Sequence, residues 1–177
     1  SGTSGLPAKG GAATDNGGAS ALNTDRTCQD LTLNSGAVIT VTGDVRINVR
    51  DDLTLNNSSQ IVVTPGSRLE LYVADRVTLS SSSSLNPLTS NPAGLTLIMY
   101  GANSDMTLNT NTSICGVVYV GDDLTMNSGS AIYGAVLVDD ELTMNGTSAI
   151  HVDTDPVSYT PLTLPTLFRA CRAGCIA

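Results

Sequence analysis

Short triplets of apolar, polar and apolar residues recur along the chain. The phrase LTLN or a close variant begins at six positions, and the successive intervals are 22, 24, 29, 18 and 18 residues. These positions are Leu31, Leu53, Val77, Met106, Leu124 and Leu142. Such intervals fit one turn of a β-solenoid, whereas helical repeats are longer and would show a period near 3.6 that is absent here. The pattern predicts an all-β fold, a single-stranded β-solenoid (parallel β-helix) of about six coils.

Other apolar positions keep their place when the coils are aligned on the phrase, and they predict the core. Two residues after the first position lie Leu33, Leu55, Leu79, Leu108, Met126 and Met144. Eight residues after it lie Ile39, Ile61, Leu85, Ile114, Ile132 and Ile150. Four residues before the next phrase lie Val49, Val73, Ala102, Val120 and Val138. The longest interval predicts an insertion in the third coil, at the Pro- and Asn-bearing segment Asn86–Gly94.

Two polar columns accompany the core. The middle residue of each phrase predicts an exposed ladder spaced by about 4.8 Å, formed by Thr32, Thr54, Thr78, Thr107, Thr125 and Thr143. Regular Thr arrays resemble the binding faces of ice-binding solenoids, but those faces usually carry two adjacent Thr columns. Each phrase ends at a polar residue, namely Asn34, Asn56, Ser80, Asn109, Asn127 or Asn145. There the coil must turn, so we expect left-handed backbone and stacked amides in a structural role.

An acidic column precedes the phrases. Its members are Asp51, Asp52, Asp75, Asp105, Asp122, Asp123, Asp139, Asp140 and Glu141. Stacked carboxylates are candidate ligands for Ca²⁺, and the candidates for a metal site are Asp122, Asp123, Asp139 and Asp140. The Gly-Gly-x-Gly-x-Asp repeat of calcium-binding β-rolls is absent. We therefore expect solvated turns and no cofactor, with calcium binding as the alternative.

Composition and charge restrict the partners. The net charge of −8, with only 8 Lys and Arg in 177 residues, argues against nucleic acid, because too few cations are available to neutralise phosphates. No run approaches the ~20 apolar residues of a membrane helix, so we expect no transmembrane segment. Four cysteines in a chain with one Lys and many Thr, Ser and Asn favour a secreted or cell-surface location.

We do not expect an enzyme. The one histidine, His151, belongs to a column with Cys115 and Tyr133, in which Tyr133 separates the two and leaves a Cys–His pair ~10 Å apart. Lyases on parallel β-helices use Lys and Arg to meet acidic sugars, and the single Lys here, Lys9, lies in a Gly- and Ala-rich tail. The acidic pairs repeat regularly, whereas a glycosidase site should interrupt the repeat.

The segment ICGVVYVGDDLTMNSGSAIYGAVLVDDELTMNGTSAIHVD resembles the C-terminal β-helical region of bacterial PilX-type pilus-assembly and surface proteins. Those regions similarly repeat a core-facing strand, a Ser-Gly-Asn turn, an Ile and a YGAV-like strand, and end in a segment like Ile150–Asp153. The similarity covers about Leu31–Asp155 and implies a surface-exposed structural or adhesive domain without catalytic residues. Such proteins usually begin with a hydrophobic anchoring helix, which nothing here matches. Bactofilins, cytoplasmic β-helices that polymerise end to end, also resemble the chain, but its cysteines and scarcity of basic residues differ.

The repeat divides the chain into three parts. We expect a Gly-, Ala- and Ser-rich N-terminal arm over residues 1–27, the solenoid over 28–155 and an extended C-terminal arm over 156–177. A solenoid exposes unpaired strand edges at both ends. We therefore expect the protein to pair with itself, head to tail, through coil ends and arms, forming a filament or pilus-like fibre. The alternative is a ligand-binding or adhesive module for glycan, ice or calcium.

Three cysteines are candidates for a covalent link between subunits. Cys28 and Cys115 are separated by about three layers, ~14 Å, and should not pair, because a disulfide needs Cα atoms within ~7 Å. Cys171 and Cys175 either pair locally or, where the arm of one subunit meets the first coil of the next, bond to Cys28.

Overall fold

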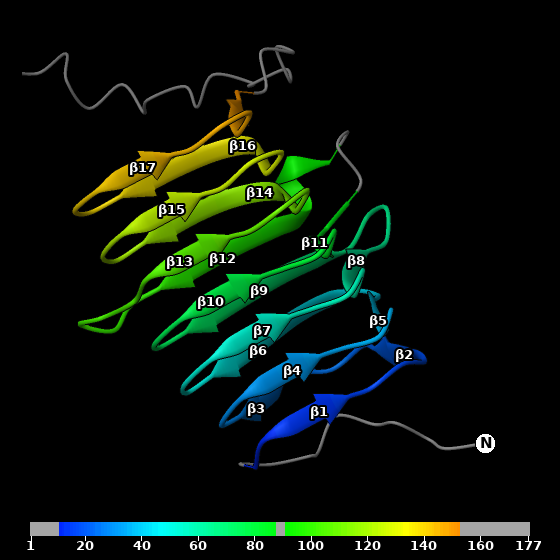
Figure 1. The fold of residues 1–177 in the computed structure, drawn as a ribbon. Coiled ribbons are helices and arrows are strands. Elements are labelled where there is room, and N and C mark those ends of the chain that lie inside the picture. Colours follow the sequence, from blue (N-terminus) through cyan, green and yellow to red (C-terminus); the bar gives the residue numbers. More distant parts are fainter. Residues whose placement is uncertain (1–10, 88–90, 153–177) are drawn as a thin grey trace, which may run out of the picture.

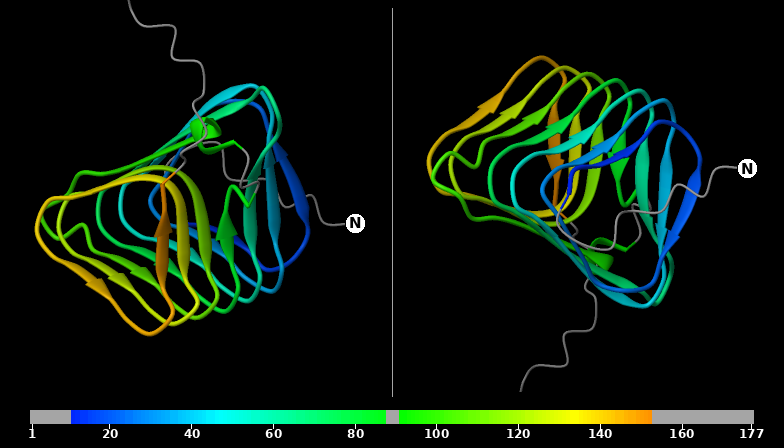
Figure 2. Two further views of the ribbon diagram at one scale, coloured as in Figure 1. Left: turned by 90° about the horizontal axis from the view of Figure 1, so that it is seen from above. Right: turned by 90° about the horizontal axis from the view of Figure 1, so that it is seen from below.

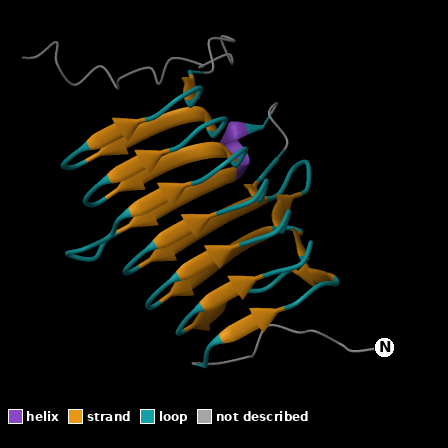
Figure 3. Ribbon diagram, in the orientation of Figure 1, coloured by secondary structure: helices purple, strands orange, loops and turns teal. Residues whose placement is uncertain are grey.

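The computed structural model describes residues 11–87 and 91–152, and its regular structure is almost entirely β-strand (Figures 1 and 3). The strands form two sheets in which the pairings are parallel, so the chain winds in successive layers. Viewed from above and below, the layers follow one another as rings around a common interior (Figure 2). The predicted β-solenoid of about six coils is confirmed.

The six phrases and one further triplet, Ala13–Asp15, form a seven-stranded sheet. Its strands, in order along the stack, are β1 (Ala13–Asp15), β4 (Leu31–Leu33), β7 (Leu53–Leu55), β10 (Val77–Leu79), β13 (Met106–Leu108), β15 (Leu124–Met126) and β17 (Leu142–Met144). Corresponding residues face each other, as Leu31 faces Leu53 and Thr32 faces Thr54. This exact repetition places every Leu-type position inward and every Thr outward, because side chains alternate along a strand.

The second sheet supplies the other two sides of each coil. One side is formed by β2 (Ala19–Leu22), β5 (Val38–Val41), β8 (Gln60–Val63) and β11 (Ser84–Leu85). The other side is formed by β3 (Arg26–Cys28), β6 (Asp44–Val49), β9 (Arg68–Val73) and β12 (Leu95–Met99). Two long strands, β14 (Ser113–Val120) and β16 (Ala131–Val138), span both sides, and β18 (Ala149–His151) pairs with the first half of β16.

Two glycines stand where the long strands pass the corner between these sides. Gly116 of β14 and Gly134 of β16 face each other. Gly134 has a φ of 131°, and a Cβ added there would collide with the carbonyl oxygen of Gly116 and approach Cβ of Pro92 to 3.2 Å. Glycine at this position permits both the backbone conformation and the close packing of layers.

The third coil is lengthened in two places: Met99 to Met106 takes 7 residues where Val73 to Val77 takes 4, and Leu85 to Leu95 takes 10 where Ile61 to Leu69 takes 8. The predicted insertion is the second of these, between β11 and β12. It begins at Asn86, a buried residue with a φ of 50°, whose side-chain amide donates to the carbonyl of Cys115 at 2.8 Å and to that of Asn91 at 3.0 Å. It ends in a 3-10 turn, η1 (Pro92–Gly94). The insertion is therefore fastened to the layer above before the chain returns to the sheet.

The predicted core columns are buried in the inner coils except at Ala102, which is exposed, so its assignment to the core is wrong. The residue that faces Val73 is instead Met99, which is fully buried. Leu33, Leu55, Ile61 and Val73 are all fully buried, and one continuous apolar cluster runs the length of the stack. In these turns the residues of positive φ lie one or two places after the Asn column, at Ser35, Gly36, Asn57, Ser58, Ser81, Ser82, Asn111, Gly129 and Gly146. The expectation that the Asn column itself supplies left-handed backbone is therefore wrong, because the turn bends immediately after it.

The solenoid begins one layer earlier than predicted. Thr14 of β1 faces Thr32, and β2 and β3 pair with β5 and β6. The expected arm over residues 1–27 is corrected accordingly, since residues 13–28 form a first coil. Its triplet Ala13–Asp15 keeps the alternation of the phrase but not its Leu residues. The expected C-terminal arm, residues 156–177, lies outside the described residues.

Candidate functional site

The outer face of the seven-stranded sheet carries the predicted Thr ladder. Thr32, Thr54, Thr78, Thr107, Thr125 and Thr143 stack in register, and Thr14 extends the column. Each strand contributes one outward Thr, with the acidic column on one side and the Asn column on the other. The ladder is therefore a single column, and the two-column array of ice-binding faces is not formed on this sheet.

Amide side chains form a hydrogen-bonded ladder beside the threonines. Asn56 donates to Asn34 at 3.0 Å, Asn127 to Asn109 at 3.0 Å, and Asn145 to Asn127 at 3.1 Å. Asn16 extends this ladder below Asn34, and Asn109 donates to the hydroxyl of Ser80. The expected structural role of stacked amides is confirmed.

A row of buried hydroxyls supports the same turns, and the sequence analysis did not identify it. Each of these hydroxyls lies three residues after a member of the Asn column and donates to the backbone carbonyl of that member. The pairs are Ser83 to Ser80, Thr112 to Asn109 and Ser130 to Asn127. The available signal was a Ser or Thr that recurs three residues after the Asn column in five of the six coils, with Ala37 as the exception. These bonds close each turn on itself, because a hydroxyl in a tight turn can bond to nearby backbone.

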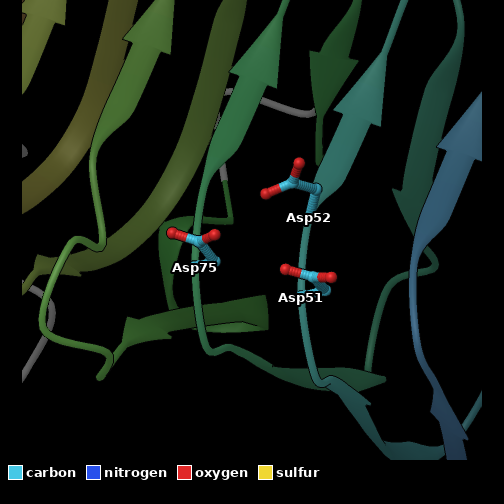
Figure 4. Close-up of side chains that lie close together, drawn as sticks. All are labelled: Asp51, Asp52 and Asp75. Atoms are coloured by element: carbon cyan, nitrogen blue, oxygen red, sulfur yellow. The ribbon is translucent and has the colours of Figure 1, made fainter.

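The acidic column forms two compact groups of carboxylates. Asp51, Asp52 and Asp75 bring one oxygen each within 4.8 Å of one another (Figure 4). The same holds for Asp105, Asp122 and Asp123. The structure thus brings together two of the four predicted metal candidates, Asp122 and Asp123, with a residue of the coil below. Asp139 and Asp140 do not join either group.

Most of these carboxylates already have partners in the fold. The Asp52 carboxylate accepts the backbone N–H of Arg76 at 3.2 Å and pairs with its guanidinium at 3.2 Å. Higher in the stack, Asp123 donates its N–H to Asp105 at 3.4 Å, and Glu141 donates to Asp123 at 3.0 Å. A carboxylate of one layer therefore accepts a backbone N–H of the next, which gives the column a structural role.

Electrostatics in the second acidic group oppose ionisation of Asp122. The pKa of Asp122 is raised above its ordinary value, first by desolvation and then by the negative charges of Asp105, Asp123, Asp140 and Asp139. Negative charges held close to the Asp122 carboxyl disfavour its charged form. A divalent cation would relieve this repulsion, and the oxygen donors are of the type that Ca²⁺ accepts.

The Cys–Tyr–His column is arranged as predicted. Cys115 faces Tyr133 and Tyr133 faces His151, so the tyrosine lies between the thiol and the imidazole. The rings of Tyr133 and His151 stack with centroids 4.6 Å apart and an interplanar angle of 9°. Cys115 is buried.

Cys28 is buried at the end of β3, facing Val49, and is only 3% exposed. Burial, with a contribution from Asp30, raises the pKa of its thiol to about 11. Cys28 and Cys115 are not joined to each other, as predicted. The candidate link from Cys28 to another subunit is disfavoured, because a buried thiol of high pKa is a poor nucleophile. Cys171 and Cys175 lie outside the described residues.

A charged hollow of about 290 Å³ lies on the outer face of β6 and β9. The Arg46 guanidinium forms an ion pair with Glu70 at 2.6 Å and lies 5.8 Å from the centroid of the Tyr72 ring. Asp25 accepts the backbone N–H of Arg46 at 2.8 Å. Arg46 and Glu70 thus engage each other, and Asp44 and Arg68 are the other charged residues that line the hollow.

The C-terminal end of the stack is apolar and open. Leu142 and Met144, inward positions of β17, are 43% and 44% exposed, whereas Ala13 of the first layer is 1% exposed. An apolar hollow of about 490 Å³ opens here between β16, β17 and β18. The end of the solenoid therefore presents the inner columns directly, and among the described residues nothing covers them.

Within the described residues, no helix is long and apolar enough to cross a membrane. Searches of curated proteins and of solved structures find no match to the chain. One family model matches residues 11–157, which includes the first coil as well as the six that the phrases predict. The chain therefore belongs to the family described as "Domain of unknown function (DUF7305)".

Proposed function

We propose that the protein is a structural β-solenoid of the bacterial cell surface that assembles with copies of itself, end to end, into a filament or pilus-like fibre. The observation that carries the proposal is the equivalence of its layers. The seven strands of the first sheet keep one register, and the two end strands, β1 and β17, each pair on one side only among the described residues. Unpaired edges of this kind are templates for further strands.

The backbone hydrogen bonds at the two ends are complementary. In inner layers the first phrase residue donates its N–H upward, as Leu31 does to Asp52 at 3.0 Å and Leu124 to Glu141 at 2.8 Å. The N–H of Leu142 therefore points away from the stack. At the other end, Ala13 is bonded to the layer above, and Thr14 directs its backbone groups outward because alternate residues of a parallel strand face opposite neighbours. A second copy can continue the same ladder.

The outer faces support a structural role. Side-chain ladders of Asn, Thr and carboxylates run along the stack and stabilise each layer on the next. The resemblance to PilX-type β-helical regions favours display at the surface, and the net charge of −8 disfavours binding to nucleic acid. No cofactor and no catalytic activity form part of the proposal.

The test is a substitution on the free edge of β1. Thr14→Pro removes the outward N–H of the first layer and leaves the Ala13 N–H, bonded to Asp30 at 2.8 Å, in place. Thr14→Val is the matched control, because it keeps the N–H and a β-branched side chain. Negative-stain microscopy of the full chain should show fibres for the original sequence and for Thr14→Val, and fewer or shorter fibres for Thr14→Pro. Equal fibres from all three chains would exclude this edge as the contact.

Calcium binding is the second candidate function, favoured by the grouping of Asp105, Asp122 and Asp123. Ca²⁺ should then raise the melting temperature of the original chain and have less effect on Asp122→Asn. An equal shift in both chains, or none, would dismiss this site. Glycan or ice binding and a bactofilin-like cytoplasmic polymer remain further alternatives, and ice-growth inhibition or cell fractionation would distinguish them.

A further inference from the structure

The last coil of the described solenoid is incomplete. β18 pairs only with Ala131–Tyr133, so within the described residues the remainder of β16 has a partner on one side only. Val136 and Val138 in that remainder, together with Ile150, are only partly buried although they continue the core columns. The missing strands are one above the end of β16 and one above β17. Both would cover the apolar hollow at this end.

The sequence beyond Val152 contains what the coil lacks. Leu162-Thr163-Leu164 repeats the triplet of β4 and β7 letter for letter. It begins 20 residues after Leu142, within the range of 18 to 29 between earlier phrases. Before it, Val157-Ser158-Tyr159 has the apolar, polar, apolar alternation of a strand with one face buried.

The connection has the right length. From the core Ile of one coil to the next phrase the chain takes 10 residues between Ile114 and Leu124, and 16 between Ile61 and Val77. From Ile150 to Leu162 it takes 12. The chain can therefore pass along the free half of β16 and reach β17, with a connection from Tyr159 to Leu162 that is one residue shorter than the connection from Val138 to Leu142.

We propose that residues 157–164 of the same chain complete this coil. Leu162–Leu164 adds to β17 as the next strand, and Val157–Tyr159 adds to the free half of β16. Leu162 and Leu164 then lie over Leu142 and Met144, and Thr163 extends the Thr ladder. The N–H of Leu142 donates to the carbonyl of Pro161, as Leu124 donates to the carbonyl of Glu141.

The prolines on either side of the triplet agree with this placement. Pro161 takes the position of Glu141, whose N–H bonds only to the side chain of Asp123, so a proline there loses no bond between backbones. Pro165 takes the position of Asn145, whose N–H does bond to the layer below, at Met126. The new strand therefore ends at Leu164. Prolines at the ends of a strand are typical of the outermost strand of a sheet.

This inference goes beyond the proposed assembly and does not depend on it. If both hold, the edge offered to the next copy is that of Leu162–Leu164, one layer beyond β17. The test is therefore made on dilute, monomeric chain, so that loss of assembly and failure of the strand are separate results.

The test is a disulfide between stacked threonines. Thr143→Cys and Thr163→Cys are combined in a chain that also carries Cys171→Ser and Cys175→Ser. Directly stacked residues have Cα atoms ~4.8 Å apart, within the range for a disulfide. The control pairs Thr125→Cys with Thr163→Cys, two layers apart and beyond that range. Under mild oxidation the first chain should form an intramolecular disulfide at least ten-fold faster than the control.

Three outcomes decide the question. A fast intramolecular bond supports the placement. A bond found only in dimers shows that a second copy covers β17, and equal rates in the two chains show that the triplet has no fixed register; either result overturns the proposal.

Amide exchange of Leu142 and Met144 gives an independent readout. Leu164→Glu should increase their exchange rates and Thr163→Glu should do so much less, because only the first places a charge against the core. Identical rates in the two variants would also contradict the placement.

Discussion

Truncation of Ile61 tests the assignment of inward and outward columns. Ile61 is fully buried and stacks between Ile39 and Leu85, while Val62 on the same strand is only half-buried and faces outward. Ile61→Ala removes three carbons, about 2.4 kcal/mol at ~0.8 kcal/mol per buried methylene, and the cavity raises the total to about 3–4 kcal/mol. Val62→Ala removes two half-exposed carbons and some strand propensity, about 1 kcal/mol.

Urea unfolding followed by circular dichroism measures both losses. The free energy of unfolding should fall by about 2–3 kcal/mol more for Ile61→Ala than for Val62→Ala, with the same slope against urea in both chains. A changed slope would indicate that single layers unfold separately, as stacked repeats can. Equal losses with equal slopes would refute the inward placement of Ile61, and with it the register of the column.

Three further predictions follow from the corner, the amide ladder and the buried thiol. Gly134→Ala should lower the free energy of unfolding by at least about 2 kcal/mol, because the added Cβ meets the Gly116 carbonyl. The control, Gly36→Ala, lies at a φ of 74° in open space and should lower it by about 1 kcal/mol. Equal melting temperatures of the two variants would contradict the packing at the corner. Asn127→Ala removes two hydrogen bonds of the amide ladder, to Asn109 and from Asn145, and should lower the free energy of unfolding in chemical denaturation by about 1–2 kcal/mol. An unchanged free energy of unfolding would show that the amide ladder does not stabilise the stack. Because the thiol pKa of Cys28 is raised from 9.0 to about 11, the thiol loses its proton at lower pH in the unfolded chain than in the folded one. The stability that the protonated thiol contributes is therefore full below pH 9 and declines between pH 9 and 11. Cys28→Ala should show a shallower decline in melting temperature over that range than the original chain, and an identical decline would contradict the shift.

The sequence was sufficient to predict the columns because the fold repeats its own geometry. Once Leu31 and Leu53 are equivalent, every residue at the same offset must occupy the same site in its layer. The first coil escaped prediction because β1 keeps only the alternation, with Ala13 in place of Leu. Comparison of residue identities detects a repeat only where the same residue types recur. Pairing of the backbones requires only the alternation of apolar and polar residues and a suitable interval between the strands.

The candidate site was harder to predict, because it depends on contacts between side chains. The acidic column was visible, but whether Asp122 groups with the coil below or above depends on rotamers that layer spacing does not determine. The same limitation hid the bond from the Glu141 N–H to Asp123. The burial of Cys28 was not predicted because the first coil was not recognised. Without that coil the residue would precede the core rather than belong to it.

Sedimentation velocity of the full chain over a hundred-fold range of concentration tests the central claim of self-assembly most directly. End-to-end stacking predicts species that grow in mass with concentration, without a fixed upper size, and that reappear as the 18.1 kDa monomer on dilution. A single monomeric species of unchanged sedimentation coefficient at every concentration would contradict the account.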